Sequence, residues 1–345
     1  MKVLMTADTL GGVWTYASEL ARALAERDVE TTVAAMGRPP DTDQRTSMRG
    51  VDLVVRECAL EWMPAAWDDV DAAGQWLLEL EDELRPDVVH LNGYVHASLP
   101  WRCAVLVTAH SDVLSWYEGV RGSSAPAEWD RYRENVERGL RAADVVVAPT
   151  AAMLAALERH YTFDAERFVI PNGPRSGRAR WTNEPLVVAV GRVWDEAKNL
   201  GALARVTPAV PWPVLVLGEG SAAGRVRAAE VEAALARASI FALPARYEPF
   251  GLSALEAALA RCALVLGDIA SLREIWDDAA LFVDPADDAE LRRALLALIA
   301  DEVRRNQLAE AALARAQVYT PSLMADRYLD LYERLAAATL EPERV

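Results

Sequence analysis

The chain has 345 residues, of which 52% are hydrophobic, and a net charge of −16 at pH 7. This length predicts about two domains, and the apolar content is ample for two cores. Nucleic acid is excluded as a partner because its phosphates would repel so acidic a surface. Residues 1–170 carry −12 of the charge, a poor match for an anionic bilayer, so no membrane association is expected.

The short apolar runs and the cysteine usage predict a cytoplasmic protein. Residues 1–7 are apolar but include Lys2 and stop at Asp8, which is too short for the apolar core of a signal peptide. No run approaches the roughly 18 apolar residues of a membrane span. The three cysteines are odd in number and widely spaced, as expected of reduced residues. No closely spaced histidines and cysteines suggest a metal site, and none is predicted.

The first half of the chain alternates apolar runs with amphipathic stretches. Such strands, apolar throughout and separated by helices, indicate a parallel sheet covered on both faces. We therefore expect a doubly wound, Rossmann-like domain. The expected strands are 3–5, 31–35, 53–55, 86–91, 104–108 and 145–148, with helices running to residue 25 and over 66–84 and 127–141.

A glycine turn and a histidine are the candidate site residues of this half. Gly11 and Gly12 follow the first strand but lack the full Gly-x-Gly-x-x-Gly fingerprint, so an ordinary tight turn fits as well as phosphate contact. His110 follows the strand 104–108, at the edge where open α/β sheets bind ligands. A lone histidine is more often structural, and both interpretations stay open here.

Three further histidines are weaker candidates. His90 occupies a similar place one unit earlier and is a weak candidate for an acceptor site. The Asn92-Gly93 pair after it has the composition of an ordinary turn. His96 and His160 rank below His90.

The alternation breaks near residues 170–173. Residues 174–184 are polar, rich in arginine and poorly periodic, as in a linker between domains. We therefore expect a first domain over 1–172 and a second over 173–320. The expected strands of the second domain are 186–190, 214–217, 240–244, 263–266 and 282–285. Its expected helices begin near 200 and cover 228–238, 254–260, 289–300 and 302–318, and a last helix covers 323–338.

Two basic residues frame the loop after the strand 186–190. Arg192, a planar fork, and Lys198, a point charge, could clamp a diphosphate from both ends of this loop. The chain uses arginine almost everywhere, and its only lysines are Lys2 and Lys198. A local reason for Lys198 is one interpretation, and chance is the other. Gly218, in the glycine turn after the strand 214–217, is assigned to the same ligand site as Arg192 and Lys198.

The stretch 246–256, Arg-Tyr-Glu-Pro-Phe-Gly-Leu-Ser-Ala-Leu-Glu, leads from an apolar strand into a helix. Glu248 lies in the loop and Glu256 about two turns into the helix, one carboxylate at each end of a ligand lying along the helix start. We expect free amides around Phe250, Gly251 and Leu252 to face outward with the positive end of the helix dipole, which suits a diphosphate. A solvated acidic helix start is the alternative.

This stretch resembles the Glu-x-Phe-Gly-Leu-x-x-x-Glu signature of family 4 of the retaining glycosyltransferases. The resemblance implies the GT-B fold, an α/β architecture of two doubly wound Rossmann-like domains facing across a cleft. It places Glu248 and His110 beside the donor sugar, Glu256 on the ribose hydroxyls, and Arg192 and Lys198 on the diphosphate. It also implies that the glycine turn near residue 11 closes over the diphosphate and acceptor, and that a last helix, 321–340, packs back onto the first domain.

The chain also departs from the family pattern. Only 27 residues separate Gly220 from Glu248, enough for one helix and one strand, which predicts a trimmed base pocket. The usual Gly-Gly turn is absent from 268–274.

The expected activity is metal-independent, retaining transfer of a sugar from a nucleotide-diphosphate donor, a co-substrate, to a carbohydrate or other hydroxyl acceptor, with no cofactor. A sugar-nucleotide 2-epimerase and a non-catalytic sugar-binding protein are the alternatives.

Overall fold

The computed structural model describes residues 1–174, 181–221 and 226–340, with side chains to residue 338. The described residues form two compact α/β units. The first comprises 1–118, 123–173 and the residues from Thr320 onward, and the second comprises Gly119–Gly122 and Pro174–Tyr319. Most of the expected linker, residues 175–180, lies outside the described residues, and its last residue, Glu184, already begins a strand.

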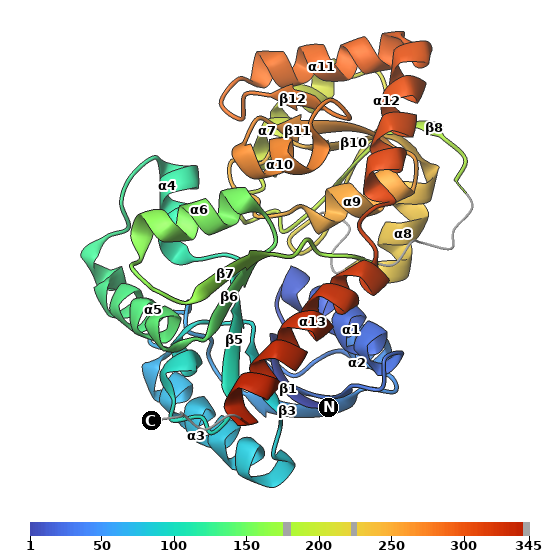
Figure 1. Cartoon of the computed structure of the whole chain (residues 1–345). Coiled ribbons are helices and arrows are strands. Elements are labelled where there is room, and N and C mark those ends of the chain that lie inside the picture. The colour runs from blue at the N-terminus through green and yellow to red at the C-terminus, as the bar shows by residue number, and fades with distance from the viewer. Residues whose placement is uncertain (175–180, 222–225, 341–345) are drawn as a thin grey trace. The chain divides into compact units, whose positions relative to one another are not determined.

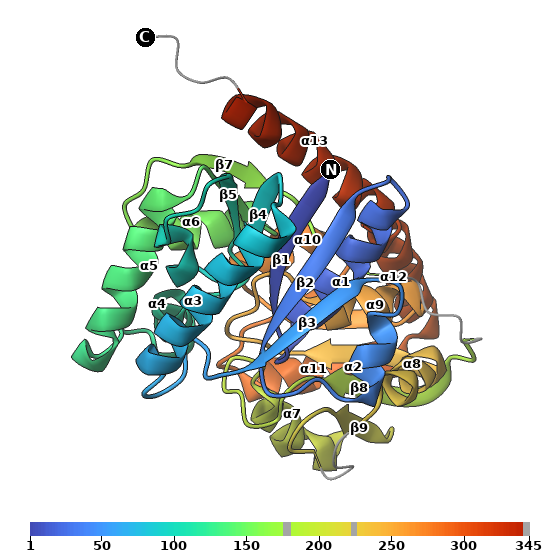
Figure 2. The ribbon, with the colours of Figure 1, turned by 90° about the horizontal axis from the view of Figure 1, so that it is seen from below.

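The first unit contains a seven-stranded sheet in which every pair of neighbours is parallel (Figures 1 and 2). The strand order is β3-β2-β1-β4-β5-β6-β7, so the direction of winding reverses between β1 and β4. Open α/β sheets bind ligands beyond the carboxyl ends of the strands at this reversal. The strands are β1 (Lys2–Asp8), β2 (Glu30–Gly37), β3 (Asp52–Glu57), β4 (Val88–Leu91), β5 (Ala104–Thr108), β6 (Val145–Ala148) and β7 (Glu166–Val169).

Helices connect these strands, and α1 shows why they form. Its buried residues Tyr16, Leu20 and Leu24 recur every four positions, so they share the face that packs on the core. The helices are α1 (Gly12–Ala25), α2 (Thr42–Ser47), α3 (Trp67–Leu84), α4 (Val113–Arg121), α5 (Asp130–Ala142) and α6 (Ala151–His160), with short 3₁₀ turns η1 (Val95–Ser98) and η2 (Ala127–Trp129).

The last helix, α13 (Pro321–Leu340), belongs to the first unit and lies against α1 and the sheet (Figure 1). Met324, Tyr328 and Tyr332 repeat at four-residue intervals and are at most 2% exposed. Their common face completes the core that α1 also covers. The first unit is therefore built from both ends of the described chain.

The second unit contains a five-stranded parallel sheet in the order β12-β11-β10-β8-β9. The winding reverses between β8 and β10, which places the expected ligand crevice of this unit beyond the carboxyl ends of these two strands. The strands are β8 (Glu184–Val190), β9 (Val214–Leu217), β10 (Ala238–Leu243), β11 (Ala263–Gly267) and β12 (Leu281–Val283).

The helices of the second unit pack around an apolar core that includes the fully buried Phe241 and Trp276. They are α7 (Leu200–Val206), α8 (Ala228–Arg237), α9 (Leu252–Leu259), α10 (Ala270–Trp276), α11 (Asp288–Ala300) and α12 (Glu302–Ala316), with the 3₁₀ turn η3 (Thr207–Ala209). Within the described ranges, none of the helices in either unit has the length and apolar character needed to cross a bilayer.

The expected strands all occur, with bounds that differ by a few residues. Besides the 3₁₀ turns, five elements were not anticipated: α2, α4, α6, α10 and β7. Strand β7 has the sequence Glu-Arg-Phe-Val, and it lies at the edge of the sheet with its two charged residues exposed. An edge strand of this kind carries no continuous apolar run, so its sequence does not stand out.

Candidate active site

The loop between β8 and α7 holds the first cation of the expected clamp. Arg192 Nη2 lies 2.6 Å from Asp195 Oδ2, and Asp195 Oδ1 accepts a hydrogen bond from the Ala197 amide at 3.0 Å. Burial opposes the charge of the Asp195 carboxyl, but the neighbouring Arg192 and Lys198 outweigh it and lower the pKa of Asp195. Asp195 therefore stays ionised and fixes the guanidinium. Sequence reasoning missed this role, although an acid three residues after Arg192 was a visible signal.

Arg192 also has an unused donor. Its Nε is buried and has no acceptor among the residues that the structure describes. Its guanidinium carbon lies 5.3 Å from the ring centre of Trp194, which is 60% exposed. A buried donor without an acceptor is costly, so it is expected where a ligand supplies one.

Lys198, Glu248 and Gly251 meet in one cluster. Lys198 Nζ lies 2.5 Å from Glu248 Oε2, and Glu248 Oε1 accepts a hydrogen bond from the Gly251 amide at 3.1 Å. The Glu248 side chain is only 10% exposed, so the carboxylate is largely shielded from water. One carboxylate thus joins Lys198, in the loop between β8 and α7, to the start of α9 within the second unit.

This arrangement corrects two expectations about the helix start. The Gly251 amide is not free, because Glu248 of the same loop takes its hydrogen bond. The amides of the first turn, beginning with Leu252, keep the usual lack of an intrahelical acceptor and point toward the amino end of α9. Glu256 lies about one turn into the helix and not two, since α9 begins at Leu252. The Phe250 side chain is 3% exposed and packs edge-on against Tyr319, so only its backbone can reach a ligand.

Two close approaches hold the loops of this site together. A Cβ on Gly218, whose φ is +132°, would lie 2.1 Å from the Gly191 carbonyl oxygen. The turn after β9 therefore packs directly on the loop between β8 and α7, which carries Arg192 and Lys198. Asn199, with φ +52°, donates from Nδ2 to the carbonyls of Pro244 and Pro285 at 2.9 and 2.8 Å. Asn199 therefore ties the loops after β8, β10 and β12, a role that its position in the sequence did not reveal.

In the first unit, the glycine turn and His110 lie at the carboxyl edge of the sheet. Gly11, with φ +77°, precedes the first residue of α1, and both Gly11 and Gly12 are exposed. His110 follows β5, and its Nε2 lies 2.8 Å from Asn92 Oδ1, beyond the end of the neighbouring strand β4. Its ring is held edge-on by Tyr16 at a centroid distance of 4.5 Å. These residues border the reversal between β1 and β4.

The other histidines have structural roles. His90 is fully buried, with Nδ1 2.6 Å from the Tyr332 hydroxyl and Nε2 2.8 Å from Thr108 Oγ1. Its suggestion as an acceptor ligand was wrong, because a ring so enclosed cannot meet a substrate. His96 is 7% exposed and bonds to a main-chain carbonyl of α3, and His160 pairs with the exposed Glu118.

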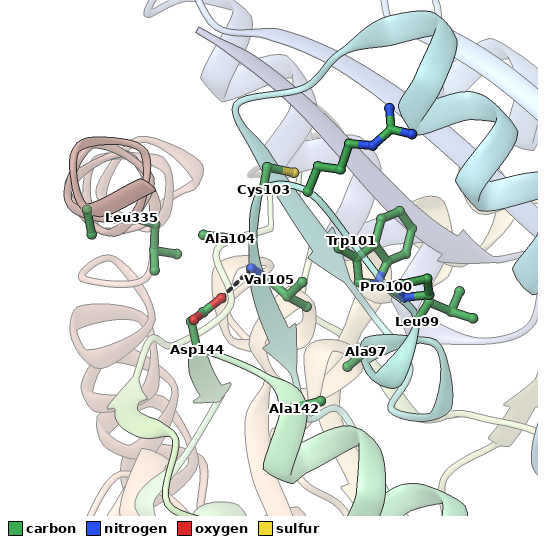
Figure 3. Close-up of a pocket in the computed structure, with 12 residues that line it drawn as sticks. Ala97, Leu99, Pro100, Trp101, Cys103, Ala104, Val105, Ala142, Asp144 and Leu335 are labelled. Carbon is green, nitrogen blue, oxygen red and sulfur yellow. Dashed lines mark hydrogen bonds between the residues drawn. The ribbon is translucent and has the colours of Figure 1, made fainter. Parts of the chain in front are cut away.

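A surface pocket of about 440 Å³ opens at the amino edge of the first sheet, where β5 begins (Figure 3). Its polar lining is used internally, since Asp144 accepts a hydrogen bond from the Val105 amide at 2.7 Å. Within the first unit, this pocket lies at the edge of the sheet opposite to the loops that carry Gly11 and His110. The strands are parallel, and those loops follow their carboxyl ends. The described residues contain no group of three or more acidic, histidine or cysteine side chains placed to hold a metal ion.

Two doubly wound parallel-sheet units define the GT-B fold, and solved structures of that fold superpose on the chain. Sucrose-phosphate synthase from Thermosynechococcus elongatus gives a TM-score of 0.79 at 18% identity and covers 98% of this chain and 100% of that one. HepE from Anabaena, in complex with UDP and glucose, gives 0.74 at 17% identity over 97% and 100% of the chains.

Sequence comparison identifies the family. Residues 10–174 match Glycosyltransferase Family 4, and residues 221–315 match Glycosyl transferases group 1. A D-inositol 3-phosphate glycosyltransferase from Xylanimonas cellulosilytica is 26% identical over 388 aligned positions, covering 93% of this chain and 91% of that protein. The chain belongs to the family 4, group 1 glycosyltransferases and is a transferase enzyme.

Proposed function

We propose that the protein transfers a sugar from a nucleoside-diphosphate donor to a hydroxyl acceptor, with retention of configuration and without a metal ion. The observation that carries this proposal is the convergence of Lys198, Glu248 and the start of α9, beside the Arg192 loop, at the winding reversal of the second sheet. A site with two cations and a helix amino end suits an anion with two phosphates.

Stabilising the leaving group is the main catalytic task of this site. Cleavage of the bond between the sugar carbon and the phosphate oxygen leaves negative charge on the nucleoside diphosphate. Arg192, Lys198 and the first-turn amides of α9 meet that charge as it grows, which is the role a metal ion plays in other transferases. The unused Nε donor of Arg192 has the chemistry to contribute a further hydrogen bond.

Retention follows if the acceptor attacks from the face that the diphosphate leaves. The acceptor oxygen forms the new bond to the sugar carbon, the carbon–phosphate oxygen bond breaks, and the departing phosphate oxygen takes the acceptor proton. This route requires no protein nucleophile. Glu248 and His110 would contact the donor sugar, Glu256 the ribose, and Gly11 and Gly12 the diphosphate and acceptor, as the family signature implies.

The names of the relatives guide the choice of substrates. HepE was solved with UDP-glucose as well as with UDP and glucose, and the Xylanimonas relative is named for an inositol phosphate. A phosphorylated polyol or sugar is therefore the first acceptor class to test. UDP sugars lead the donor panel, followed by GDP, ADP and dTDP sugars.

The test is nucleotide release from each donor with and without acceptors, in the presence and absence of EDTA. Acceptor-dependent release that EDTA leaves unchanged, with a product of the donor's anomeric configuration by NMR, supports the proposal. Inversion of the anomeric centre, or activity only with added metal, refutes the corresponding part. Release without acceptor and with a 2-epimeric sugar product would indicate an epimerase instead.

A further inference from the structure

The side-chain amide of Asn92 is held on both sides by fixed partners in the first unit. Asn92 Nδ2 lies 2.6 Å from the Thr6 carbonyl oxygen, and Asn92 Oδ1 lies 2.8 Å from His110 Nε2. The Asn92 backbone amide also donates to Thr6 Oγ1 at 2.9 Å. These bonds link the loop after β4 to β1 and to the loop after β5, so the side-chain amide of Asn92 has no freedom to turn.

The hydrogen-bond chemistry fixes which nitrogen of His110 carries the proton. A main-chain carbonyl only accepts, so the atom facing Thr6 must be the NH₂ group of Asn92. The atom facing His110 is then the amide oxygen, which also only accepts. His110 Nε2 must therefore donate, and Nδ1 is left without a proton in the neutral ring.

The surroundings keep the ring neutral and fixed in its plane. Burial lowers the pKa of His110 to about 3, so the second proton is not bound near neutral pH. The Tyr16 ring packs edge-on against the imidazole. Nδ1 has no hydrogen-bond partner among the residues that the structure describes, and the His110 side chain is only partly buried.

We propose that Asn92 is a positioning residue that holds His110 as the Nε2–H tautomer, so that Nδ1 accepts a hydrogen bond from a hydroxyl group of the transferred sugar. The tautomer follows from the geometry of the first unit alone, whereas the sugar contact rests on the proposed function. Asn92, which the sequence analysis treats as part of an ordinary turn, thus acquires a specific role.

The tautomer is tested by ¹⁵N NMR of the full chain, without any substrate. The chain has four histidines, and a His110→Gln variant assigns the signals of this ring. We expect one tautomer with Nε2 protonated, and a second tautomer to appear in Asn92→Ala. An Nδ1–H tautomer in the unaltered protein would overturn the proposal.

The sugar contact is tested with the sugar nucleotide that the donor panel identifies and with its nucleoside diphosphate alone. Only the sugar nucleotide should shift the Nδ1 signal, and a shift caused equally by both ligands would contradict a sugar contact. Asn92→Ala should lower kcat/KM about tenfold, the equivalent of one hydrogen bond of about 1.4 kcal/mol.

Thr6→Val is the matched control for the kinetic measurement. It removes the hydroxyl that anchors the Asn92 backbone and leaves the Asn92 side chain in place. We expect the wild-type tautomer and kcat/KM within about twofold in this variant. An equal loss in Thr6→Val, or an unchanged kcat/KM in Asn92→Ala, overturns the proposal. If no sugar nucleotide is turned over, the proposed function fails and the NMR result still decides the tautomer.

Discussion

Replacing Lys198 by methionine removes the ammonium group and keeps most of the side-chain volume. The structure predicts two separate effects. In the folded protein, Glu248 loses the partner 2.5 Å from its Oε2 and keeps the Gly251 amide, with its side chain only 10% exposed. Leaving such a carboxylate half-satisfied costs about 1–3 kcal/mol of folding free energy.

The second effect is on the transition state. If Lys198 meets the charge that develops on the diphosphate, its loss should lower turnover by about a hundredfold or more, which corresponds to about 3 kcal/mol or above. Turnover is measured as nucleotide release at saturating donor, and folding free energy by urea denaturation. Arg192→Ala should lose turnover on the same scale.

Two variants separate these effects. Lys198→Met combined with Glu248→Gln removes the unpaired charge, so it should regain stability but not turnover. Arg205→Met removes a cation of the same unit whose ion pair with Asp288 is exposed, with side chains 57% and 38% accessible. This control should change stability by no more than about 1 kcal/mol and leave turnover unchanged. Turnover within threefold of wild type in Lys198→Met, or its recovery in the double variant, would refute the clamp.

Three further predictions follow from other parts of the molecule. Gly218→Ala should destabilise the protein by more than Gly50→Ala, and it should also lower turnover. Both positions have positive φ, which costs a non-glycine residue about 1–2 kcal/mol, but only a Cβ on Gly218 meets backbone atoms, those of Gly191. Equal effects of the two variants in urea denaturation and in nucleotide release would contradict this reasoning. Burial lowers the folded pKa of His90 to about 3, against an ordinary 6.5 in the unfolded chain. Below pH 6.5 the unfolded chain therefore binds a proton that the folded chain refuses at this ring, so the contribution of His90 to stability should fall by about 1.4 kcal/mol per pH unit, and His110 should add a fall of similar size. Urea titrations between pH 7 and 4 should show a shallower slope for His90→Gln, and parallel slopes would disprove this origin. Removing divalent metals with EDTA should leave the rate of transfer unchanged, and a loss restored by added Mg²⁺ would show that a metal takes part.

The fold could be predicted because its signals are local. Interior strands such as β10 contain an apolar run, here residues 240–243, and several of them, such as β1, lead into a helix with a regular apolar face. The start of α9 could also be placed, since glycine and an apolar strand mark its loop. Elements without these marks were missed, and the edge strand β7 is the clearest example.

The connections within the site could not be predicted, because they join residues that are distant in the chain. Lys198 and Glu248 were each expected to face a ligand, but no local pattern indicates that they pair with each other across 50 positions. His90 was ranked as a weak acceptor-site candidate because it occupies a place similar to that of His110, one unit earlier in the chain. Its actual environment is set by Tyr332, 242 positions away, which converts an apparent site residue into part of the core.

The route of the chain also affects how the protein can assemble during synthesis. The first unit needs α13, whose tyrosines enclose His90, yet the chain passes through Pro174–Tyr319, the main segment of the second unit, before that helix is made. The second unit has all of its strands and its own core before α13 leaves the ribosome, so it can reach its final form earlier. Until then the apolar side chains of α1 that share a core with α13 lack that partner, and a chaperone would be expected to act on them.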